Sequence, residues 1–391
     1  MIRDRQDGPA KDAPTDFKHL WPLDPQVKHL NHGAYGATPC SVIAEQDRLR
    51  RLVDRNPHKW FSQMLESRVV EARTRLAGFL HARPERVALV DNVSAGVSAV
   101  LASLPLTAAD QILVTDHLYG AVRFAVERLS ARTGAQVCEI HIPPGAAADD
   151  VVERLISRVG SRTRLAVVDH VSANTCMLFP VRQLQEQFRA RGVRVLWDGA
   201  HVPGMLPVDL DGLAPDFWVG NFHKWAFAPR GTALLYVRDP AETPIRSNVV
   251  SWNETEPYPR NFDRVGTSDL TAWVAAPSAL DFIHELGEDR LHAHNNALAR
   301  HAQQVIAEAI GVDTARLWGD DALSIRAVPL PEGPVTSRQS AMALQSLISD
   351  QYRIETAIRP LGGSGILRVS AQRYNTIEEF EELAGCLRAL F

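Results

Sequence analysis

Short apolar runs alternate with helix-like stretches through the middle of the chain. The runs are continuous rather than alternating with polar residues, which is typical of strands covered on both faces of a sheet. The stretch 121–131 has the pattern of a helix that stops at Gly134. Strands that alternate with helices predict an open, mostly parallel α/β sheet. The predicted strands are 87–90, 112–115, 165–168, 193–197, 217–219 and 233–237.

The pattern changes after Asp269. Long amphipathic stretches at 272–286, 290–310, 339–348 and 377–390 surround short strands at 323–328 and 366–370. This order predicts a smaller, C-terminal α+β domain at 271–391, after a large domain at 68–270. The segment 18–67 is expected to pack against both domains. The first residues, 1–17, are charged and contain proline, and we expect a flexible arm there.

Composition narrows the class of protein. The chain has 391 residues, 45% of them hydrophobic, enough for more than one core, and a net charge of -4. This charge gives no indication of a nucleic-acid partner or an anionic membrane surface. No apolar run approaches the ~20 residues of a membrane span. The N-terminus lacks the apolar region of a secretory signal, and four widely separated cysteines without CxxC spacing favour a cytoplasmic protein with reduced thiols.

Candidate chemistry is concentrated in the segments VRVLWDGAHVPG and FWVGNFHKWAFAPRG. Asp198 ends one predicted strand, and Lys224 follows the next strand after a short loop. Ligands of open α/β sheets bind beyond the carboxyl ends of the strands. Taken singly, a turn carboxylate and an exposed loop lysine are the commoner interpretations. However, the apolar surroundings of Lys224 would desolvate its amine, lower its pKa and make it nucleophilic.

The pair of residues fits pyridoxal phosphate. This cofactor needs a lysine amine to form a Schiff base and a carboxylate to hold the pyridine nitrogen protonated. A phosphate site is also indicated, because Ser94, Ala95 and Gly96 follow a predicted strand and open a probable helix. Small residues at a helix N-terminus let backbone N–H groups approach a phosphate. An ordinary serine N-cap is the alternative interpretation.

Eight segments of the chain resemble, in order, the motifs of class V aminotransferase-like enzymes of fold type I. The isopenicillin N epimerase-like branch is the most similar that we identify, and the resemblance runs from about Leu30 to the C-terminus. It implies a large domain with a mostly parallel, seven-stranded type of sheet, and pyridoxal phosphate as the cofactor. The segments are LNHGAYGATP, DNVSAGVSAV, TDHLYGAVR, DHVSANT, WDGAHVPG, HKWAFAPRG, RVGTSD and LRVSAQRYNT.

The resemblance implies roles around the reactive carbon. Lys224 is similar to the Schiff-base lysine, and Asp198 to the partner of the pyridine nitrogen. His201 matches a position near the phenolic oxygen of the cofactor, although on its own it is more simply a core histidine. His117 is our preferred residue for stacking on the cofactor ring, with Tyr119 as the alternative; by itself His117 is more simply a surface histidine.

Further roles concern the phosphate and the subunit interface. By resemblance, Asn221 and His223 face the phosphate. Thr267 would reach the phosphate from a neighbouring subunit, which implies a homodimer with sites at its interface. No metal site is predicted.

Substrate binding is assigned by the same resemblance. Arg368, in the strand-like ILRVS, matches a clamp for the substrate α-carboxylate, a role that suits the planar fork of arginine. Without the family it would be an exposed strand arginine. Asn31, His32, Tyr35 and the segment 56–61, with Trp60, are expected to shape the substrate pocket, and plain packing is nearly as well supported.

Two departures bear on the reaction. Cysteine desulfurases carry a nucleophilic cysteine shortly before the carboxylate arginine, whereas IRPLGGSGILR has none and Cys386 follows the arginine on a probable helix. Persulfide chemistry is therefore disfavoured. Asn174 stands where the epimerase branch usually has proline, so Asn174 is a candidate to hydrogen-bond cofactor or substrate, and epimerisation of the branch's usual substrate is in question.

These observations favour one reaction class among several. We expect a lyase that processes an S-substituted cysteine in specialised metabolism, such as antibiotic biosynthesis. Amino-acid epimerisation is the alternative, but no proton donor for the second face of Cα is evident. Decarboxylation-coupled oxidative deamination is a third outcome. A non-catalytic binding module of the same fold is disfavoured, because Lys224, Asp198 and Arg368 are all present.

Overall fold

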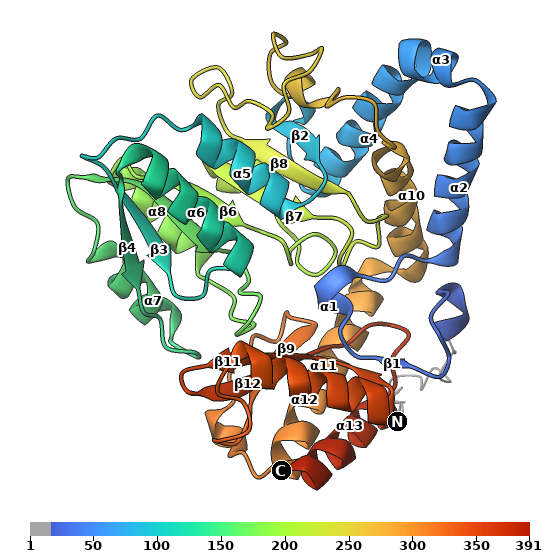
Figure 1. The fold of residues 1–391 in the computed structure, drawn as a ribbon, viewed down its shortest axis with the longest axis vertical. Coiled ribbons are helices and arrows are strands. Elements are labelled where there is room, and N and C mark those ends of the chain that lie inside the picture. Colours follow the sequence, from blue (N-terminus) through green and yellow to red (C-terminus); the bar gives the residue numbers. More distant parts are fainter. Residues whose placement is uncertain (1–16) are drawn as a thin grey trace, which may run out of the picture.

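The computed structural model describes residues 17–391, so the arm expected at 1–17 lies, except for Phe17, outside the described residues. A large twisted sheet flanked by helices occupies the upper part of the molecule, and a smaller sheet covered by helices lies below it (Figure 1). Within residues 17–391 no helix is both long and apolar enough to cross a membrane.

The large sheet has seven strands in the order β2-β8-β7-β6-β5-β3-β4. All neighbouring strands are parallel except β8, which runs antiparallel to both β2 and β7. This arrangement confirms the predicted mostly parallel α/β architecture. The strands are β2 (Val87–Val90), β3 (Gln111–Thr115), β4 (Gln136–Ile140), β5 (Thr163–Asp169), β6 (Arg194–Asp198), β7 (Phe217–Asn221) and β8 (Ala233–Val237).

Burial of both faces explains the continuous apolar runs. Every residue of β2, β7 and β8 is buried. One face packs against α5 and α6, while Trp197 and Trp218 lie in the cluster on the opposite face. The sequence pattern missed β4, because this edge strand exposes three of its five residues. The helices of this part are α5 (Val93–Ser103), α6 (Gly120–Thr133), α7 (Ala148–Ile156), α8 (Val181–Ala190) and α9 (Leu210–Leu213).

The C-terminal part contains an antiparallel sheet in the order β11-β12-β9. Its apolar side chains form a core with α11, α12 and α13. The elements are α10 (Thr271–Leu286), α11 (Glu288–Ala309), β9 (Ile325–Pro329), α12 (Arg338–Tyr352), β10 (Ile354–Glu355), β11 (Ala357–Leu361), β12 (Ser364–Ser370) and α13 (Ile377–Leu390).

The N-terminal segment contacts both parts. β1 pairs in parallel with β10, while the Trp21 ring packs on Phe227 of the large part and on Tyr374 of the C-terminal part. Its long helices lie beside α10 at the edge of the molecule (Figure 1). The exact domain boundaries stay a prediction. The elements are β1 (Lys28–His29), α1 (His32–Tyr35), α2 (Cys40–Arg55), α3 (Pro57–Lys59), a π-helical segment (Trp60–Met64) and α4 (Leu65–Phe79).

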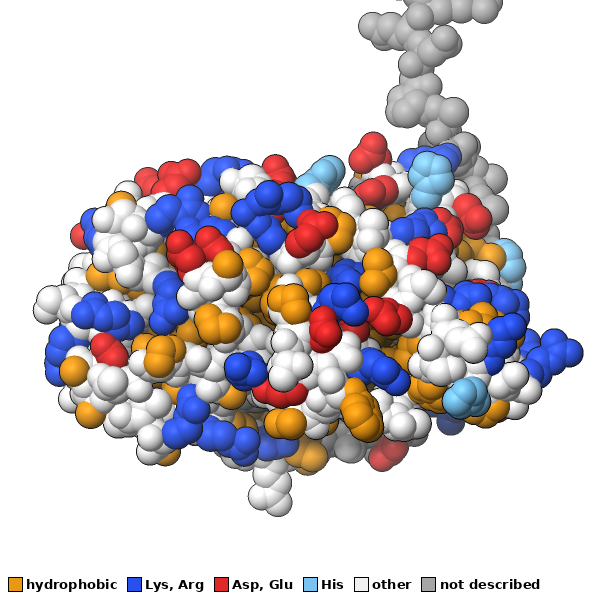
Figure 2. All heavy atoms as spheres, turned by 90° about the horizontal axis from the view of Figure 1, so that it is seen from above, with side chains coloured by type: hydrophobic (Ala, Val, Ile, Leu, Met, Phe, Trp, Pro, Cys, Tyr) orange, Lys and Arg blue, Asp and Glu red, His pale blue; other side chains and the backbone are white. Residues whose placement is uncertain are grey.

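Charges of both signs are mixed on the surface. Figure 2 shows Lys and Arg side chains interspersed with Asp and Glu over one face of the molecule, with apolar side chains scattered between them. This distribution agrees with the small net charge of the chain, -4.

Candidate active site

Lys224 is brought against His201 beyond the carboxyl ends of β6 and β7. The Lys224 Nζ atom lies 3.2 Å from His201 Nε2, and the Trp225 indole donates a hydrogen bond of 3.2 Å to His201 Nδ1. His201 is 1% exposed. The two sequence segments that suggested a catalytic lysine and a cofactor-facing histidine therefore meet at one point.

The environment of Lys224 favours the neutral form of its amine. Burial, with a further contribution from the Arg368 charge, lowers the pKa of Lys224 to about 7, and the Asp198 carboxylate opposes this shift. The hydrogen bonds indicate the same state. Because an indole N–H only donates, His201 Nδ1 accepts, and a neutral His201 then carries its hydrogen on Nε2. That hydrogen points to the lone pair of an unprotonated Lys224 amine.

Asp198 is the last residue of β6 and is 3% exposed. Its Oδ1 accepts a hydrogen bond of 2.9 Å from the Ala200 N–H. Burial raises the pKa of the Asp198 carboxyl, while the Ala200 N–H and the Lys224 charge oppose that rise. A buried carboxylate at this point suits a ligand that brings its own positive charge, such as a protonated pyridine nitrogen.

The predicted phosphate turn is partly used within the chain. The Ala95 N–H donates to Asn92 Oδ1, and the Gly96 N–H donates to the Asn92 carbonyl. Asn221 Oδ1 accepts from the Val93 N–H. Among the described residues this leaves Ser94 as the residue of the first helical turn whose N–H and hydroxyl have no hydrogen-bond partner.

Gly96 has a packing reason of its own. A Cβ atom at this position would lie 2.6 Å from the Val219 Cγ1 atom, so the glycine lets α5 approach β7 closely. His223, the other residue expected near the phosphate, has one ring nitrogen engaged. Its Nδ1 atom contacts the Thr232 carbonyl at 3.2 Å, and burial lowers the pKa of His223 to about 4. A neutral His223 keeps one ring nitrogen available for a ligand.

His117 and Tyr119 differ in how far they are already engaged. Both ring nitrogens of the buried His117 have partners, the Thr175 hydroxyl at 2.6 Å and the Ile142 carbonyl at 2.7 Å. Tyr119 is 47% exposed, and its phenol lies close enough to Arg368 to act on the pKa of that guanidinium. The stacking role of His117, with Tyr119 as the alternative, stays a prediction.

Arg368 is held at the boundary between the two parts of the molecule. Its Nη1 donates to the Ala173 carbonyl at 2.7 Å and its Nη2 to Asn31 Oδ1 at 3.0 Å, while its buried Nε has no partner among the described residues. Asn174, next to Ala173, is half-buried. Cys176 is buried near the Arg368 guanidinium and adopts a φ of 53°, a left-handed conformation that favours glycine.

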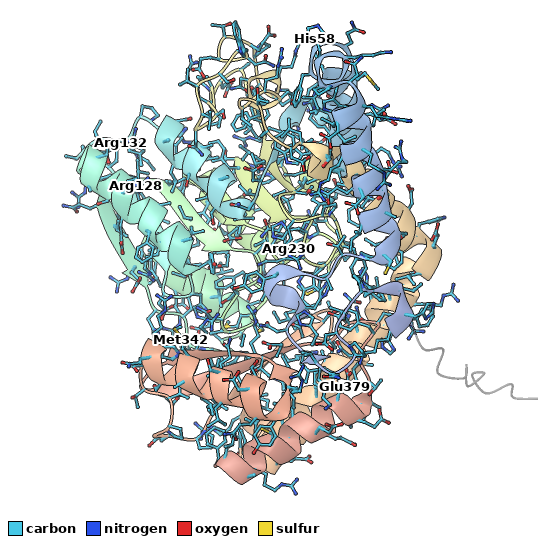
Figure 3. The ribbon with its side chains drawn as sticks, turned by 45° about the vertical axis from the view of Figure 1, so that its right-hand side comes forward. His58, Arg128, Arg132, Arg230, Met342 and Glu379 are labelled. Carbon is cyan, nitrogen blue, oxygen red and sulfur yellow. The ribbon has the colours of Figure 1, made fainter. Side chains whose placement is uncertain are left out.

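His32 contacts the lysine loop rather than open space. It is fully buried, and its ring nitrogens lie 3.0 Å from the Tyr374 hydroxyl and 3.0 Å from the Lys224 carbonyl. Gly36 follows with a φ of 67°, and a Cβ there would lie 1.9 Å from the His223 carbonyl oxygen. The Arg230 guanidinium, labelled near the centre of Figure 3, donates to the Gly36 carbonyl at 3.0 Å.

Trp60 and Thr267 line one hollow, and Lys224, His201 and Arg368 are not part of its lining. Both line a surface hollow of about 340 Å³ with Arg50 and Phe61. His58, two residues before Trp60, lies at the far end of α2 from Arg230 (Figure 3). Tyr35 is 71% exposed at the end of α1. The substrate-binding roles of Trp60 and Tyr35 and the inter-subunit role of Thr267 stay predictions.

Three residues of the site were missed by sequence reasoning. Trp225 orients His201, Tyr374 supports His32, and Asp169 ends β5 beside Asp198. Only Asp169 carried a detectable signal, since it ends an apolar run in the same way as Asp198. Together, the neutral lysine and the buried carboxylate form a set that fits pyridoxal phosphate.

Comparisons with known proteins agree with this arrangement. Residues 36–383 match the family model described as aminotransferase class-V. Isopenicillin N epimerase of Streptomyces clavuligerus is 32% identical, covering 94% of this chain and 96% of the relative. Putative L-cysteine desulfhydrase 1 of Oryza sativa subsp. japonica is 29% identical, covering 96% and 85%.

Solved structures share the fold. A mutant of the cystine C–S lyase C-DES, with glycine covalently linked to its pyridoxal phosphate, has a TM-score of 0.80 at 21% identity, covering 96% of this chain and 99% of that one. The apo cysteine desulfurase of Thermococcus onnurineus NA1 has a TM-score of 0.78 at 22% identity, covering 96% and 97%. The chain belongs to the class-V aminotransferase family, with the fold of type I and pyridoxal phosphate as its cofactor.

Proposed function

We propose that this protein is a pyridoxal-phosphate-dependent lyase that removes the sulfur substituent from Cβ of an S-substituted cysteine. The observation that carries the proposal is the buried, neutral Lys224 between His201 and Arg368. Relatives named cysteine desulfhydrases support the reaction class. When bound, the cofactor withdraws electrons from Cα of an amino acid and so lowers the barrier to breaking bonds there.

The positions of several residues support a set that would hold the cofactor. Asp198 would pair with the pyridine nitrogen, and His201 would contact the phenolic oxygen. Ser94, Asn221 and His223 approach the phosphate from the ends of α5 and β7. His117 or Tyr119 would cover the ring: the in-plane hydrogen bonds of His117 fix its ring and leave the faces free to stack, whereas Tyr119 is exposed and less constrained.

Lys224 is the residue that moves the Cα proton. A base works best when its pKa lies near the working pH, and burial brings the pKa of Lys224 to about 7. His201, held by the Trp225 indole, keeps the amine neutral and oriented by donating its Nε2 hydrogen. His32 holds the carbonyl of the same lysine, so we assign it to positioning the base.

Arg368 binds the substrate carboxylate. Its contacts to the Ala173 carbonyl and to Asn31 fix the plane of the guanidinium, and its remaining N–H groups are available for a carboxylate. Asn31 therefore acts through Arg368. Asn174, beside Ala173, is placed to contact the same substrate.

Epimerisation is the second candidate. It is favoured by 32% identity to isopenicillin N epimerase. Inversion requires a proton donor on the face of Cα opposite Lys224, and the phenols of Tyr35 and Tyr119 near Arg368 are candidates. Proton return to the same carbon would then replace departure of the sulfur group.

A product survey tests the proposal. The purified protein with pyridoxal phosphate is incubated with S-methylcysteine and other S-alkyl and S-glycosyl cysteines, and thiol, pyruvate and the enantiomer of the substrate are measured. Pyruvate and thiol in equal amounts are expected. Inverted amino acid without pyruvate would favour the epimerase, and an aldehyde would indicate decarboxylation. The variant Lys224→Ala controls for reaction catalysed by the free cofactor.

A homodimer is part of the same proposal. The hollow that contains Thr267 and Trp60 is separate from Lys224 of the same chain, so we assign it to the cofactor phosphate of a second copy. Sedimentation should give twice the mass of one chain. Thr267→Ala should weaken binding of pyridoxal phosphate, and a monomeric, fully active protein would contradict the assignment.

A further inference from the structure

Two carboxyl groups lie side by side at the end of the large sheet. Asp169 ends β5 and Asp198 ends β6, and the two residues are direct register partners in parallel strands. Partners in register point to the same face, on strands about 4.8 Å apart. Asp169 is 1% exposed and Asp198 is 3% exposed. Both groups are therefore removed from water on the same side of the sheet.

The surroundings do not compensate two negative charges. The backbone N–H groups of Asp169 itself and of Tyr119 hydrogen-bond to the Asp169 carboxyl, and Arg123 of α6, which is paired with Glu139, acts on this carboxyl through space. Asp169 Oδ2 has no hydrogen-bond partner among the described residues. None of the ion pairs within residues 17–391 includes Asp169 or Asp198. Without a directly paired cation, ionisation of both buried carboxyls is strongly unfavourable.

Asp198 is the better candidate for the ionised member, because Asp169 has a buried Oδ2 without a partner among the described residues and no atom of Asp198 does. Asp198 accepts the Ala200 N–H at 2.9 Å, which stabilises its anion, and the Lys224 amine adds to this whenever it is protonated. Burial, and then the neighbouring Asp198 charge, raise the pKa of Asp169 well above its usual value. We propose that Asp169 carries a proton in the folded protein and acts as a positioning residue that leaves the single negative charge of the pair on Asp198.

This proton has a use in the site. A charged Asp169 would repel Asp198 and favour protonation of the carboxyl that faces the pyridine nitrogen. A neutral Asp169 keeps that carboxyl ionised. The presence of the proton is independent of the proposed function, whereas its use rests on the role proposed there for Asp198.

The first test measures the proton itself. Infrared spectra of the full chain, without and with pyridoxal phosphate, are recorded at pH 8 for wild type, Asp169→Asn and Asp169→Leu. A carbonyl band of a protonated carboxylic acid is expected in wild type and should be lost in both variants, so one well-folded variant suffices. Absence of that band from wild type at pH 8, or its persistence in a folded variant, overturns the proposal.

The second test uses stability. A raised folded-state pKa makes the folding constant fall as pH rises from ~3.9, by up to about tenfold per pH unit until the folded-state pKa is reached. Asp169→Asn has no carboxyl at this position and so does not lose stability in this way. The difference in free energy of unfolding between Asp169→Asn and wild type, measured by urea unfolding of the cofactor-free chain, should therefore favour the variant more at pH 8 than at pH 5. Asp150→Asn is the control, because Asp150 is paired with Arg154, whose charge does not change between pH 5 and pH 8, so this variant should give no such gain. An equal difference at both pH values would overturn the proposal.

The third test concerns the use of the proton. The visible spectrum of the chain loaded with pyridoxal phosphate is titrated with pH for Asp169→Asn and Asp198→Asn. Asp169→Asn should keep the wild-type profile, and Asp198→Asn should change it. If Asp169→Asn alters the profile as much as Asp198→Asn, Asp169 supplies the charge and the proposal is overturned. If neither variant alters it while the infrared band is present, the use fails with the assignment of Asp198, and the proton stands.

Discussion

Replacement of Arg368 by lysine tests how the substrate is held. The guanidinium now makes hydrogen bonds of 2.7 Å to the Ala173 carbonyl and 3.0 Å to Asn31, and still has N–H groups for a carboxylate. A lysine has the same charge but no planar fork, so at least one charge-assisted hydrogen bond to substrate is lost. Such a bond contributes about 1.5–3 kcal/mol, which corresponds to roughly one to two orders of magnitude in substrate affinity.

The loss should fall on substrate capture rather than on the cofactor. Steady-state kinetics of wild type and Arg368→Lys are compared for an S-alkyl cysteine and for its amine analogue without the carboxylate. We expect kcat/KM for the amino acid to fall by about 10- to 100-fold, with little change for the amine and in pyridoxal-phosphate affinity. A variant that discriminates between the two compounds as strongly as wild type would refute the clamp.

Three further changes test the lysine and its support. Lys224→Ala should abolish turnover while far-ultraviolet circular dichroism stays that of wild type, and normal turnover would remove this residue from the mechanism. Because burial lowers the pKa of Lys224 to about 7, kcat should rise with pH through that value, and a flat profile between pH 6 and 8 would contradict the assignment. Gly36→Ala should destabilise the protein by at least ~1 kcal/mol in urea unfolding, since φ is 67° and the new Cβ would meet the His223 carbonyl.

The local pattern of apolar residues was sufficient to predict most strands of the large sheet. Strands buried on both faces must be apolar at every position, so six of the seven were visible in the sequence, including β5 and β6. The seventh, β4, lies at an edge and carries polar residues, and only its hydrogen bonds to β3 reveal it. The pattern of apolar residues therefore indicates which strands are buried, and it does not reveal a strand that is exposed.

The sequence alone determined which kind of chemistry to expect. Asp198 and Lys224 each follow a buried strand, and parallel strands bring their carboxyl ends to one edge, so their meeting was predictable. The family resemblance added the cofactor and the carboxylate role of Arg368. The first conclusion needs only the order of elements along the chain, and the others need the sequence motifs of the family.

Only the tertiary structure decided which groups touch. His32 contacts the Lys224 carbonyl across 192 residues of sequence, and Asn31 contacts Arg368 across 337. Asp169 acquires its importance from the register that places it beside Asp198. Contact, burial and hydrogen-bond partners set whether a group is charged, and they arise from packing between distant segments, which no local pattern of residues encodes.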